Sequence, residues 1–155
     1  MQLNIDEYEA YLLAIAVWRE ARGEGYDGML AVAYTLMTRV RHPRWWGKDL
    51  VDVIAMRYQV SSMTDAHDPQ LIYWPRRGDS SFETAMKASV DAIEETVPNP
   101  VETADHYHDH TVKPKWAEPQ YFVKRIGKLM FYSLERKDGG PASQRPNLSL
   151  KEIGY

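Results

Sequence analysis

Leu-Leu-Ala-Ile-Ala-Val-Trp-Arg-Glu-Ala-Arg-Gly-Glu, residues 12–24, is the stretch that decides most about the fold. Seven consecutive apolar residues lead into a basic residue and a carboxylate, and a glycine follows shortly after. In a helix, Leu13, Val17 and Glu20 fall on one face, because residues three and four apart are neighbours. That face is apolar until Glu20, and Gly23 is expected to supply the left-handed turn that closes the helix.

Glu20 has two interpretations. A carboxyl group at the end of an apolar face is partly stripped of water, which disfavours the charged form and raises the pKa. A raised pKa suits a general acid that works near neutral pH, so Glu20 is a candidate catalytic residue. Alternatively, Glu20 is the first solvated residue beyond a buried helix, and perturbed acids also occur in structural networks. The spacing alone leaves both interpretations open.

Composition excludes several classes of protein. The chain has 155 residues, 44% of them hydrophobic and 26% charged, which is ordinary for one globular domain. The absence of cysteine excludes disulfides, thiol catalysis and cysteine-ligated metal sites. A net charge of −3 provides no bulk attraction to nucleic acid or to an anionic membrane.

The residues around Glu20 resemble a known family. Trp-Arg-Glu-Ala-Arg-Gly-Glu at 18–24 is similar to the Glu-Ala-Arg-Gly-Glu signature of the cell-wall hydrolases typified by the spore cortex-lytic enzymes SleB and CwlJ. The resemblance continues in family order over about residues 8–132. The further segments are Ala31-Val32-Ala33 with Thr38-Arg39-Val40, Val53-Ile54, Gln59-Val60-Ser61, Ala104–Asp109, Lys113–Ala117 and Ile126–Tyr132. The chain departs from the family at Thr38, which replaces asparagine, and at Val60, which replaces phenylalanine.

An α+β domain that is mainly α-helical, with a small antiparallel sheet, is the expected fold. The resemblance implies a lysozyme-like or lytic-transglycosylase-like cleft with the acid at the end of the first helix. The domain is expected to span residues 1–137, and residues 138–155 form a polar C-terminal tail. Apolar spacing, caps and prolines predict the following elements: helices over 6–22, from Asp27 to His42-Pro43, over 49–57 and over 82–97 behind a Ser80 or Ser81 cap, a strand or extended loop at 59–64, an irregular cleft or lid segment at 65–78, and strands near 104–110 and 124–134.

The chemistry implied by the resemblance is cleavage of the β-1,4 bond between N-acetylmuramic acid and N-acetylglucosamine in peptidoglycan. Such a bond usually requires two carboxylates. Beside N-acetylmuramic acid the sugar's own C6 hydroxyl can attack instead, giving a 1,6-anhydro product, so one acid suffices. Glu20 is the one well-placed acid, which favours a lytic transglycosylase over a hydrolytic muramidase. Glu24 is a possible second carboxylate, or else it orients Arg22 or the connecting turn.

Five further residues are candidates for substrate binding. Gln59, Ser61 and Ser62 offer amide and hydroxyl groups for N-acetyl or hydroxyl contacts, although a capped turn explains them equally well. Tyr107 and Trp116 match family aromatics and are able to stack on sugar rings, with core packing as the alternative.

A histidine-rich strand provides the competing hypothesis. Period-two alternation places His106, His108 and His110 on one face, where they could hold a divalent metal with His67 or Asp68 as a further ligand. The alternative function is therefore a metal-dependent peptidoglycan amidase or peptidase. The plainer interpretation is a polar strand face along a cleft. The preferred glycosidase reading requires no cofactor and no metal.

Basic and aromatic residues at 39–48 suggest a nucleic-acid interface as another class of function. A solvated loop whose tryptophans pack inward is the preferred reading, since the chain is acidic overall. The expected partner is therefore the peptidoglycan glycan strand, bound by a monomer with no nucleic acid and no membrane insertion.

The opening residues, Met1 to Glu7, are acidic and lack the basic region of a secretion signal. The apolar run at 12–18 is too short to span a bilayer. We therefore expect a bacteriophage endolysin, held in the host cytoplasm until a separate membrane-permeabilising protein releases it to the cell wall at lysis.

Overall fold

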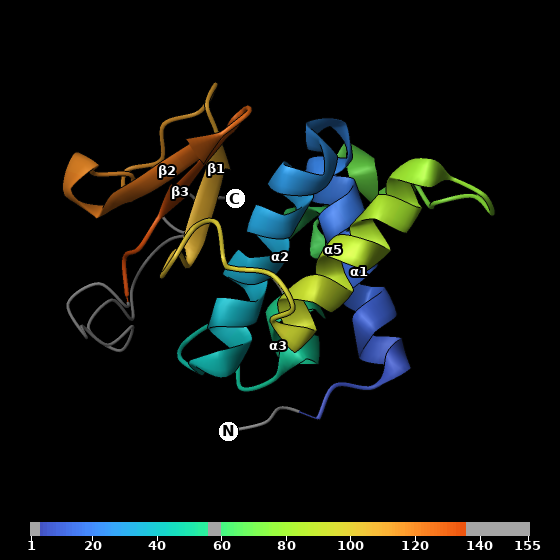
Figure 1. Cartoon of the computed structure of the whole chain (residues 1–155). Coiled ribbons are helices and arrows are strands. Elements are labelled where there is room, and N and C mark those ends of the chain that lie inside the picture. The colour runs from blue at the N-terminus through green and yellow to red at the C-terminus, as the bar shows by residue number, and fades with distance from the viewer. Residues whose placement is uncertain (1–3, 56–59, 136–155) are drawn as a thin grey trace.

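A computed structural model describes residues 4–55 and 60–135 of the chain (Figure 1). The predicted tail at 138–155 lies outside these residues. The described part contains five α-helices, three short 3-10 helices and three strands. Their bounds are α1 Glu7–Ala21, η1 Arg22–Glu24, α2 Gly25–Arg41, α3 Leu50–Ala55, α4 Ser61–Thr64, η2 Pro69–Ile72, α5 Ser80–Glu94, β1 His106–Asp109, η3 Pro119–Tyr121, β2 Phe122–Ile126 and β3 Leu129–Tyr132.

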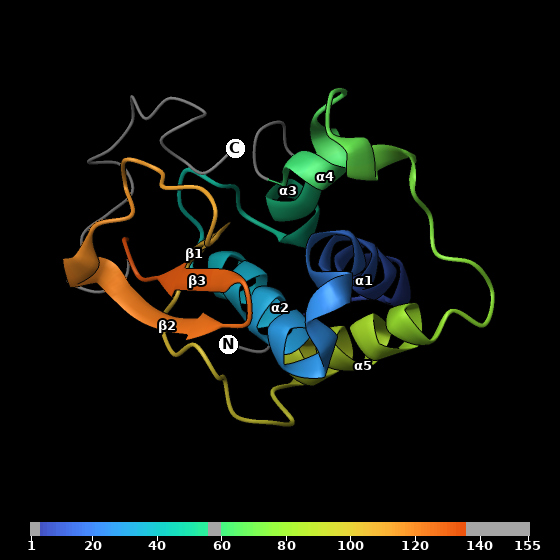
Figure 2. The ribbon, with the colours of Figure 1, turned by 90° about the horizontal axis from the view of Figure 1, so that it is seen from above.

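The central helix is α2. Every residue from Gly28 to Val40 is buried, so this helix is enclosed on all sides, as expected of a core helix. It packs against α1 and α5 and also contacts the sheet. Figures 1 and 2 show α1 and α5 on one side of α2 and the three strands on the other. The predicted α+β architecture is confirmed.

The start of α1 follows the prediction and its end does not. Asp6 caps the helix, accepting from the Glu9 backbone N–H at 2.8 Å while Glu9 accepts from the Asp6 N–H in return. The expected left-handed turn at Gly23 is wrong. The chain continues through η1 instead, and the residue with positive φ is Gly25, at 72°. Consequently α2 begins at Gly25, before the predicted Asp27 cap.

Two other predicted boundaries change. The cap of α5 is Asp79 rather than a serine, because its Oδ1 accepts from the backbone N–H of Ser81 at 2.9 Å. Residues 61–64 form the short helix α4 instead of a strand or extended loop. Of the predicted helix over 49–57, the structure gives α3 from Leu50 to Ala55, and 56–57 lie outside the described residues.

The sheet is antiparallel with strand order β1-β3-β2. The single strand predicted near 124–134 is a hairpin of two strands, β2 and β3. Its turn contains Gly127, whose φ of 56° favours glycine. On the other side, β3 pairs with β1, with His108 opposite Met130. Among the described residues, no helix has the length and apolarity needed to cross a membrane.

Candidate active site

Glu20 lies in the last turn of α1, where α1 meets α2, α4 and β1. It stays partly exposed, as a proton donor that meets a substrate must. The protein packed around its carboxyl group removes water, and this desolvation raises the pKa of Glu20. The side chain therefore has the electrostatic environment that a general acid requires.

Tyr107 of β1 is the direct partner of this acid. Its hydroxyl donates a hydrogen bond to Glu20 Oε1, which lowers the pKa and opposes part of the effect of burial. The tyrosine ring packs against Phe131 of β3, with centroids 6.0 Å apart. The sequence predicts sugar stacking for Tyr107, whereas the structure joins its hydroxyl to the candidate catalytic carboxyl group.

Ser62 is a second predicted substrate-binding residue that lies near Glu20. Its side chain is fully buried and its hydroxyl has no well-formed hydrogen bond. The hydroxyl still lies near enough to Glu20 to favour the charged carboxylate and lower its pKa. Ser61 belongs to the same short helix, α4, and Gln59 lies outside the described residues.

Asp68 is the second carboxylate that acts on Glu20. Its negative charge raises the pKa of Glu20. Burial has the largest effect on that pKa, the hydroxyl groups of Tyr107 and Ser62 come next, and Asp68 follows them. It caps η2, where its Oδ1 accepts from the Gln70 backbone N–H at 2.8 Å. From the sequence, Asp68 is considered only as a metal ligand, because it lies in an irregular segment with no spacing that relates it to Glu20.

Arg19 holds that segment in place. Arg19 is a buried residue that is 5% exposed. Its guanidinium donates to the backbone carbonyls of Ser62, Leu71 and Tyr73 at 3.0, 3.2 and 3.0 Å. It also lies 4.5 Å from the centre of the Trp74 ring. Sequence reasoning missed this residue, because its partners are backbone atoms far along the chain.

Glu24 has a different neighbourhood. Its Oε2 accepts from the Lys128 backbone N–H at 3.2 Å, in the turn between β2 and β3. A Cβ at Gly127 would lie 2.0 Å from the same oxygen, and one at Gly28 would lie 2.4 Å from Glu24 Cβ. The main influences on the pKa of Glu20 do not include Glu24. The geometry favours the structural interpretation, with Glu24 joining the α1–α2 connection to the hairpin.

The histidine-bearing face of β1 is packed inside the protein. His106 is 1% exposed and pairs with Asp105 through Nδ1 at 2.9 Å, while His108 Nε2 lies 3.2 Å from the Tyr132 hydroxyl. His110 follows the end of β1 and is partly exposed. The described residues contain no group of three His, Asp or Glu side chains placed to hold a metal ion. The packing of His106 and His108 therefore disfavours both the metal-site interpretation and the polar cleft face.

Trp116 belongs to the same packed layer. It is 5% exposed, and its ring lies 5.0 Å from His106, 5.6 Å from His108 and 5.3 Å from Tyr132. Sugar stacking requires an open ring face, so the geometry favours core packing over the predicted sugar contact.

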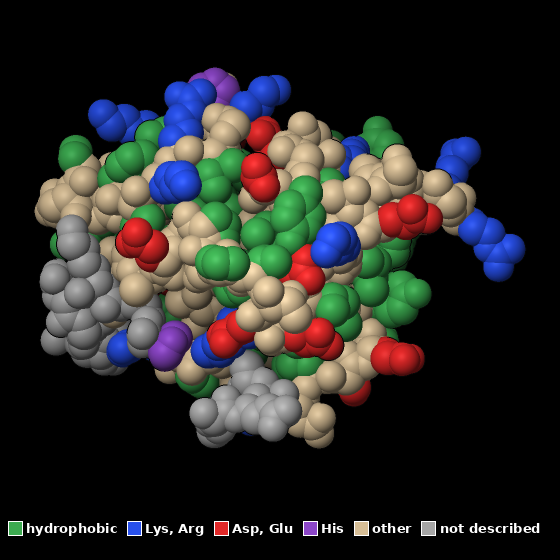
Figure 3. All heavy atoms as spheres, in the orientation of Figure 1, with side chains coloured by type: hydrophobic (Ala, Val, Ile, Leu, Met, Phe, Trp, Pro, Cys, Tyr) green, Lys and Arg blue, Asp and Glu red, His purple; other side chains and the backbone are tan. Residues whose placement is uncertain are grey.

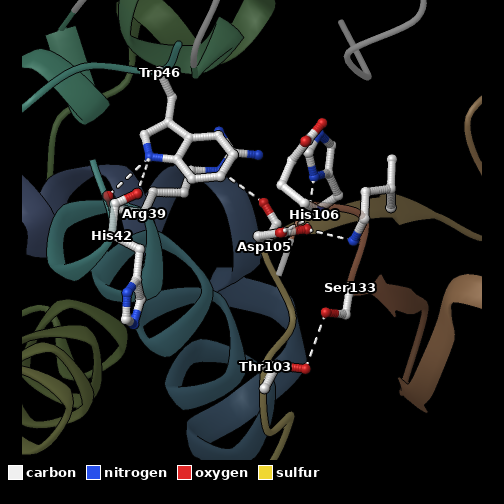
Figure 4. Close-up of polar contacts among 9 residues, drawn as sticks. Arg39, His42, Trp46, Thr103, Asp105, His106 and Ser133 are labelled. Carbon is white, nitrogen blue, oxygen red and sulfur yellow. Dashed lines mark hydrogen bonds and ion pairs between the residues drawn. The ribbon is translucent and has the colours of Figure 1, made fainter. Parts of the chain in front are cut away.

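Asp105 anchors β1 behind the site (Figure 4). Its carboxylate accepts from the backbone N–H groups of Leu134 and Glu135, both at 2.9 Å, and its carbonyl accepts from Arg39 Nε at 2.7 Å. Burial raises the pKa of Asp105, but His106 and these N–H groups outweigh it and the net pKa is lowered. The network ties β1 to α2 and thereby holds Tyr107 over Glu20.

The basic and aromatic segment at 39–48 is also partly internal. Trp46 is fully buried and its indole N–H donates to the Arg39 carbonyl at 2.8 Å. Arg39 itself is 4% exposed. A nucleic-acid surface requires accessible cations, so these buried residues favour the interpretation as inward packing.

Comparison with known proteins agrees with this architecture. The sequence pattern described as Cell Wall Hydrolase matches residues 23–132. The chain belongs to this cell wall hydrolase family. Glu20 stands just before the matched span.

Two spore cortex-lytic enzymes illustrate the relationship. The chain is 35% identical to the spore cortex-lytic enzyme of Bacillus subtilis over 123 residues. The match covers 77% of this chain and 36% of the relative. The chain is 31% identical to the spore cortex-lytic enzyme of Halalkalibacterium halodurans over 120 residues. This match covers 77% of this chain and 33% of the relative. The chain thus spans about a third of the length of these relatives.

Solved structures confirm the fold. The catalytic domain of the Bacillus cereus SleB protein superposes with a TM-score of 0.65 at 29% identity, over 83% of this chain and 92% of that one. The catalytic domain of the germination-specific lytic transglycosylase SleB from Bacillus anthracis gives 0.66 at 28% identity, over 85% and 99%. The cell wall hydrolase therefore has the lysozyme-like fold that the sequence resemblance implies.

Proposed function

We propose that this cell wall hydrolase cuts the β-1,4 bond between N-acetylmuramic acid and N-acetylglucosamine, as a lytic transglycosylase with Glu20 as its single general acid and base. The observation that carries the proposal is the position of Glu20 at the end of α1, where the Tyr107 hydroxyl binds its carboxyl group and the surrounding protein raises its pKa. The description of its structural relative as a lytic transglycosylase supports the same bond and product.

The reaction needs no water and no second enzyme nucleophile. Protonated Glu20 gives its proton to the glycosidic oxygen, and N-acetylglucosamine leaves with a C4 hydroxyl. The C6 hydroxyl of N-acetylmuramic acid attacks C1 of the same sugar, forming the 1,6-anhydro bond, and its proton returns to the Glu20 carboxylate. Glu20 is then ready for another turnover.

Three neighbours support these steps. Tyr107 orients the carboxyl group through its hydrogen bond. Asp68 favours the protonated acid before cleavage, and its negative charge stabilises the positive charge that develops at C1. The fully buried Ser62 hydroxyl acts on the Glu20 carboxyl group from within the protein and favours its charged form, which forms when the proton is given up.

Mass spectrometry of fragments released from purified peptidoglycan tests the proposal. Anhydro-muramic acid ends are the expected product. Reducing muramic acid ends would mean hydrolysis, with Asp68 as the second carboxylate, and freed peptides would mean that another bond is cut. Fragments released in EDTA are expected to be the same, since the proposed chemistry uses no metal.

We also propose that the protein is a monomeric endolysin, held in the host cytoplasm until a separate protein permeabilises the membrane. Bacteria that express the chain in the cytoplasm are expected to remain intact. Co-expression of a membrane-permeabilising protein is expected to lyse them, and a Glu20→Gln variant is expected to leave them intact. Lysis without permeabilisation would contradict this mode of delivery.

A further inference from the structure

We propose that an exposed surface made by Arg22, Tyr73, Trp74, Arg76 and Arg77, here called the aromatic–arginine rim, binds a carboxylate-bearing stretch of the glycan strand being cut. This inference rests on the proposed function and adds a second contact to the same substrate. The rim begins at the C-terminal end of α1 and follows the segment that connects η2 to α5, visible as the long outer loop of Figure 2. Farther along this segment, Arg76 and Arg77 line a pocket with Tyr11 and Ile15 of α1.

Large apolar side chains are exposed side by side in this segment. Ile72 is 78% exposed, Tyr73 48% and Trp74 63%. Single exposed apolar residues are common, but three in succession on an irregular segment form a contiguous patch, which marks an interaction surface. Open aromatic faces of this kind suit the apolar faces of sugar rings.

The segment is held firmly at both ends, so the rings are presented in a fixed position. On one side, Arg19 binds the carbonyls of Leu71 and Tyr73. On the other, the Trp18 indole N–H donates to Ser81 Oγ at 2.8 Å, next to the Asp79 cap of α5. A preorganised surface avoids much of the entropic cost of binding.

The rim carries three arginines in a chain whose net charge is −3. Asp79 and Glu83 line the same pocket as Arg76 and Arg77, so the three cations face two carboxylates. The Arg22 guanidinium lies 4.4 Å from the Trp18 ring centre and 5.3 Å from that of Tyr73. Within residues 4–55 and 60–135, no carboxylate forms an ion pair with Arg22, Arg76 or Arg77. In Figure 3, basic side chains project from the edge that this loop occupies in Figure 1.

Charge and shape together point to a particular occupant. Peptidoglycan presents sugar rings in series. It carries carboxylates on its stem peptides and on the lactyl groups of muramic acid residues that bear no peptide. Arginine binds carboxylates in a two-pronged geometry. Arg76 and Arg77 are exposed and can offer this geometry, whereas Arg22 is partly buried and its Nη1 atom is inaccessible. An uncharged glycan would use the rings and leave the cations without partners.

The rim is close enough to the candidate acid to share one strand with it. Arg22 lies two positions beyond Glu20, and its ring partner Tyr73 is bound by Arg19, the neighbour of Glu20. The same segment carries Asp68, whose charge acts on Glu20. A strand with its scissile bond at Glu20 is therefore able to continue over the rim around the end of α1.

Retention on insoluble peptidoglycan tests the rim separately from catalysis. In a Glu20→Gln background, which preserves the substrate, the pairs Tyr73→Ala with Trp74→Ala and Arg76→Ala with Arg77→Ala are each expected to weaken retention at least fivefold. Tyr8→Ala is the matched control, because Tyr8 is 71% exposed in the first turn of α1, about 18 Å along the helix from Glu20. Unfolding midpoints equal to the parent show that the variants are folded.

The proposal would be overturned if both double variants were retained on peptidoglycan as well as the parent protein. Chitin, an uncharged glycan, is expected to retain the parent at least fivefold less than peptidoglycan, and equal retention would contradict a carboxylate-bearing ligand. Loss of retention together with an absence of anhydro products from the unaltered chain would overturn the proposed function and leave the rim supported.

Discussion

The Tyr107 hydroxyl donates a hydrogen bond to Glu20 Oε1, joining β1 to the end of α1 across 87 positions of the chain. Each residue is placed by a different part of the fold. Glu20 is positioned by the helix that packs on α2 and α5, whereas Tyr107 is positioned by the Asp105 network and by pairing with Phe131. The candidate site therefore exists only where the sheet meets the helices.

Removing this hydrogen bond is expected to change both rate and pH dependence. Tyr107 lowers the pKa of Glu20, so in Tyr107→Phe that pKa rises and the acid stays protonated to higher pH. The decline of kcat at high pH is expected to move upward, and kcat at the optimum to fall about tenfold because the carboxyl group is less well oriented. An unchanged profile, equal to that of a Tyr8→Phe control, would contradict the role given to Tyr107.

The charge of Asp68 is expected to act in the opposite sense. Asp68 raises the pKa of Glu20, so Asp68→Asn lowers that pKa, and the decline of kcat with rising pH moves to lower pH. The loss at the optimum is expected to stay below about tenfold, since Asp68 is not required as a nucleophile in a transglycosylase. Asp65→Asn, in the same segment, is the control. A loss above about 10²-fold would instead assign Asp68 the second carboxylate role of a hydrolase.

Because Glu24 contacts the hairpin at Gly127, alanine at Gly127 is expected to destabilise the protein more than alanine at Gly23. Alanine at Gly127 places a Cβ 2.0 Å from Glu24 Oε2 and forces a side chain into a φ of 56°. Gly127→Ala is expected to lower the free energy of unfolding by about 1–2 kcal/mol. Gly23→Ala meets no atom within 4 Å and is expected to leave stability unchanged or slightly higher. Denaturant unfolding measures both, and equal stabilities would contradict the contact.

Burial of Glu20 is expected to cost the folded state stability at neutral pH. Folding raises the pKa of this group, so its favourable contribution is complete below the unfolded pKa of about 4.3 and is lost as pH rises through the folded pKa. Glu20→Gln removes the charge, and its unfolding midpoint is expected to exceed that of the unaltered chain at pH 8. The difference is expected to vanish near pH 4. An exposed Glu94→Gln control should show no such pattern, and a Glu20→Gln variant less stable at pH 8 would count against the buried acid.

Local signals predicted the helical part of the fold. The capping residue Asp6 and the spacing of apolar residues in α1 and α2 act within a few turns of the chain, so they are readable from sequence. The helix end predicted at Gly23 is wrong because the chain continues there as a 3-10 helix. The residue with positive φ is Gly25, two positions later. The hairpin at Gly127 was missed because β2 and β3 are short and nearly continuous in sequence.

The candidate site was predicted in part for the same reason. Glu20 is visible as the acid that ends an apolar face, and Tyr107 through the family resemblance. Ser62 is visible only as a hydroxyl group next to the family-matched Ser61. Asp68 and Arg19 could not be found in this way, because their effects on Glu20 and on the 71–74 backbone depend on folding of an irregular segment against α1. Alternation correctly placed His106 and His108 on one face of β1, but alternation does not show whether a face is open or packed.

The rate of peptidoglycan cleavage by Glu20→Gln, beside that of Glu24→Gln, tests the central claim most directly. Glutamine keeps the shape of the side chain and removes its transferable proton. The account predicts that Glu20→Gln loses at least 10²-fold in rate while remaining folded, and that Glu24→Gln stays within about tenfold of the unaltered chain. Cleavage by Glu20→Gln at the full rate would contradict the assignment of the proton donor.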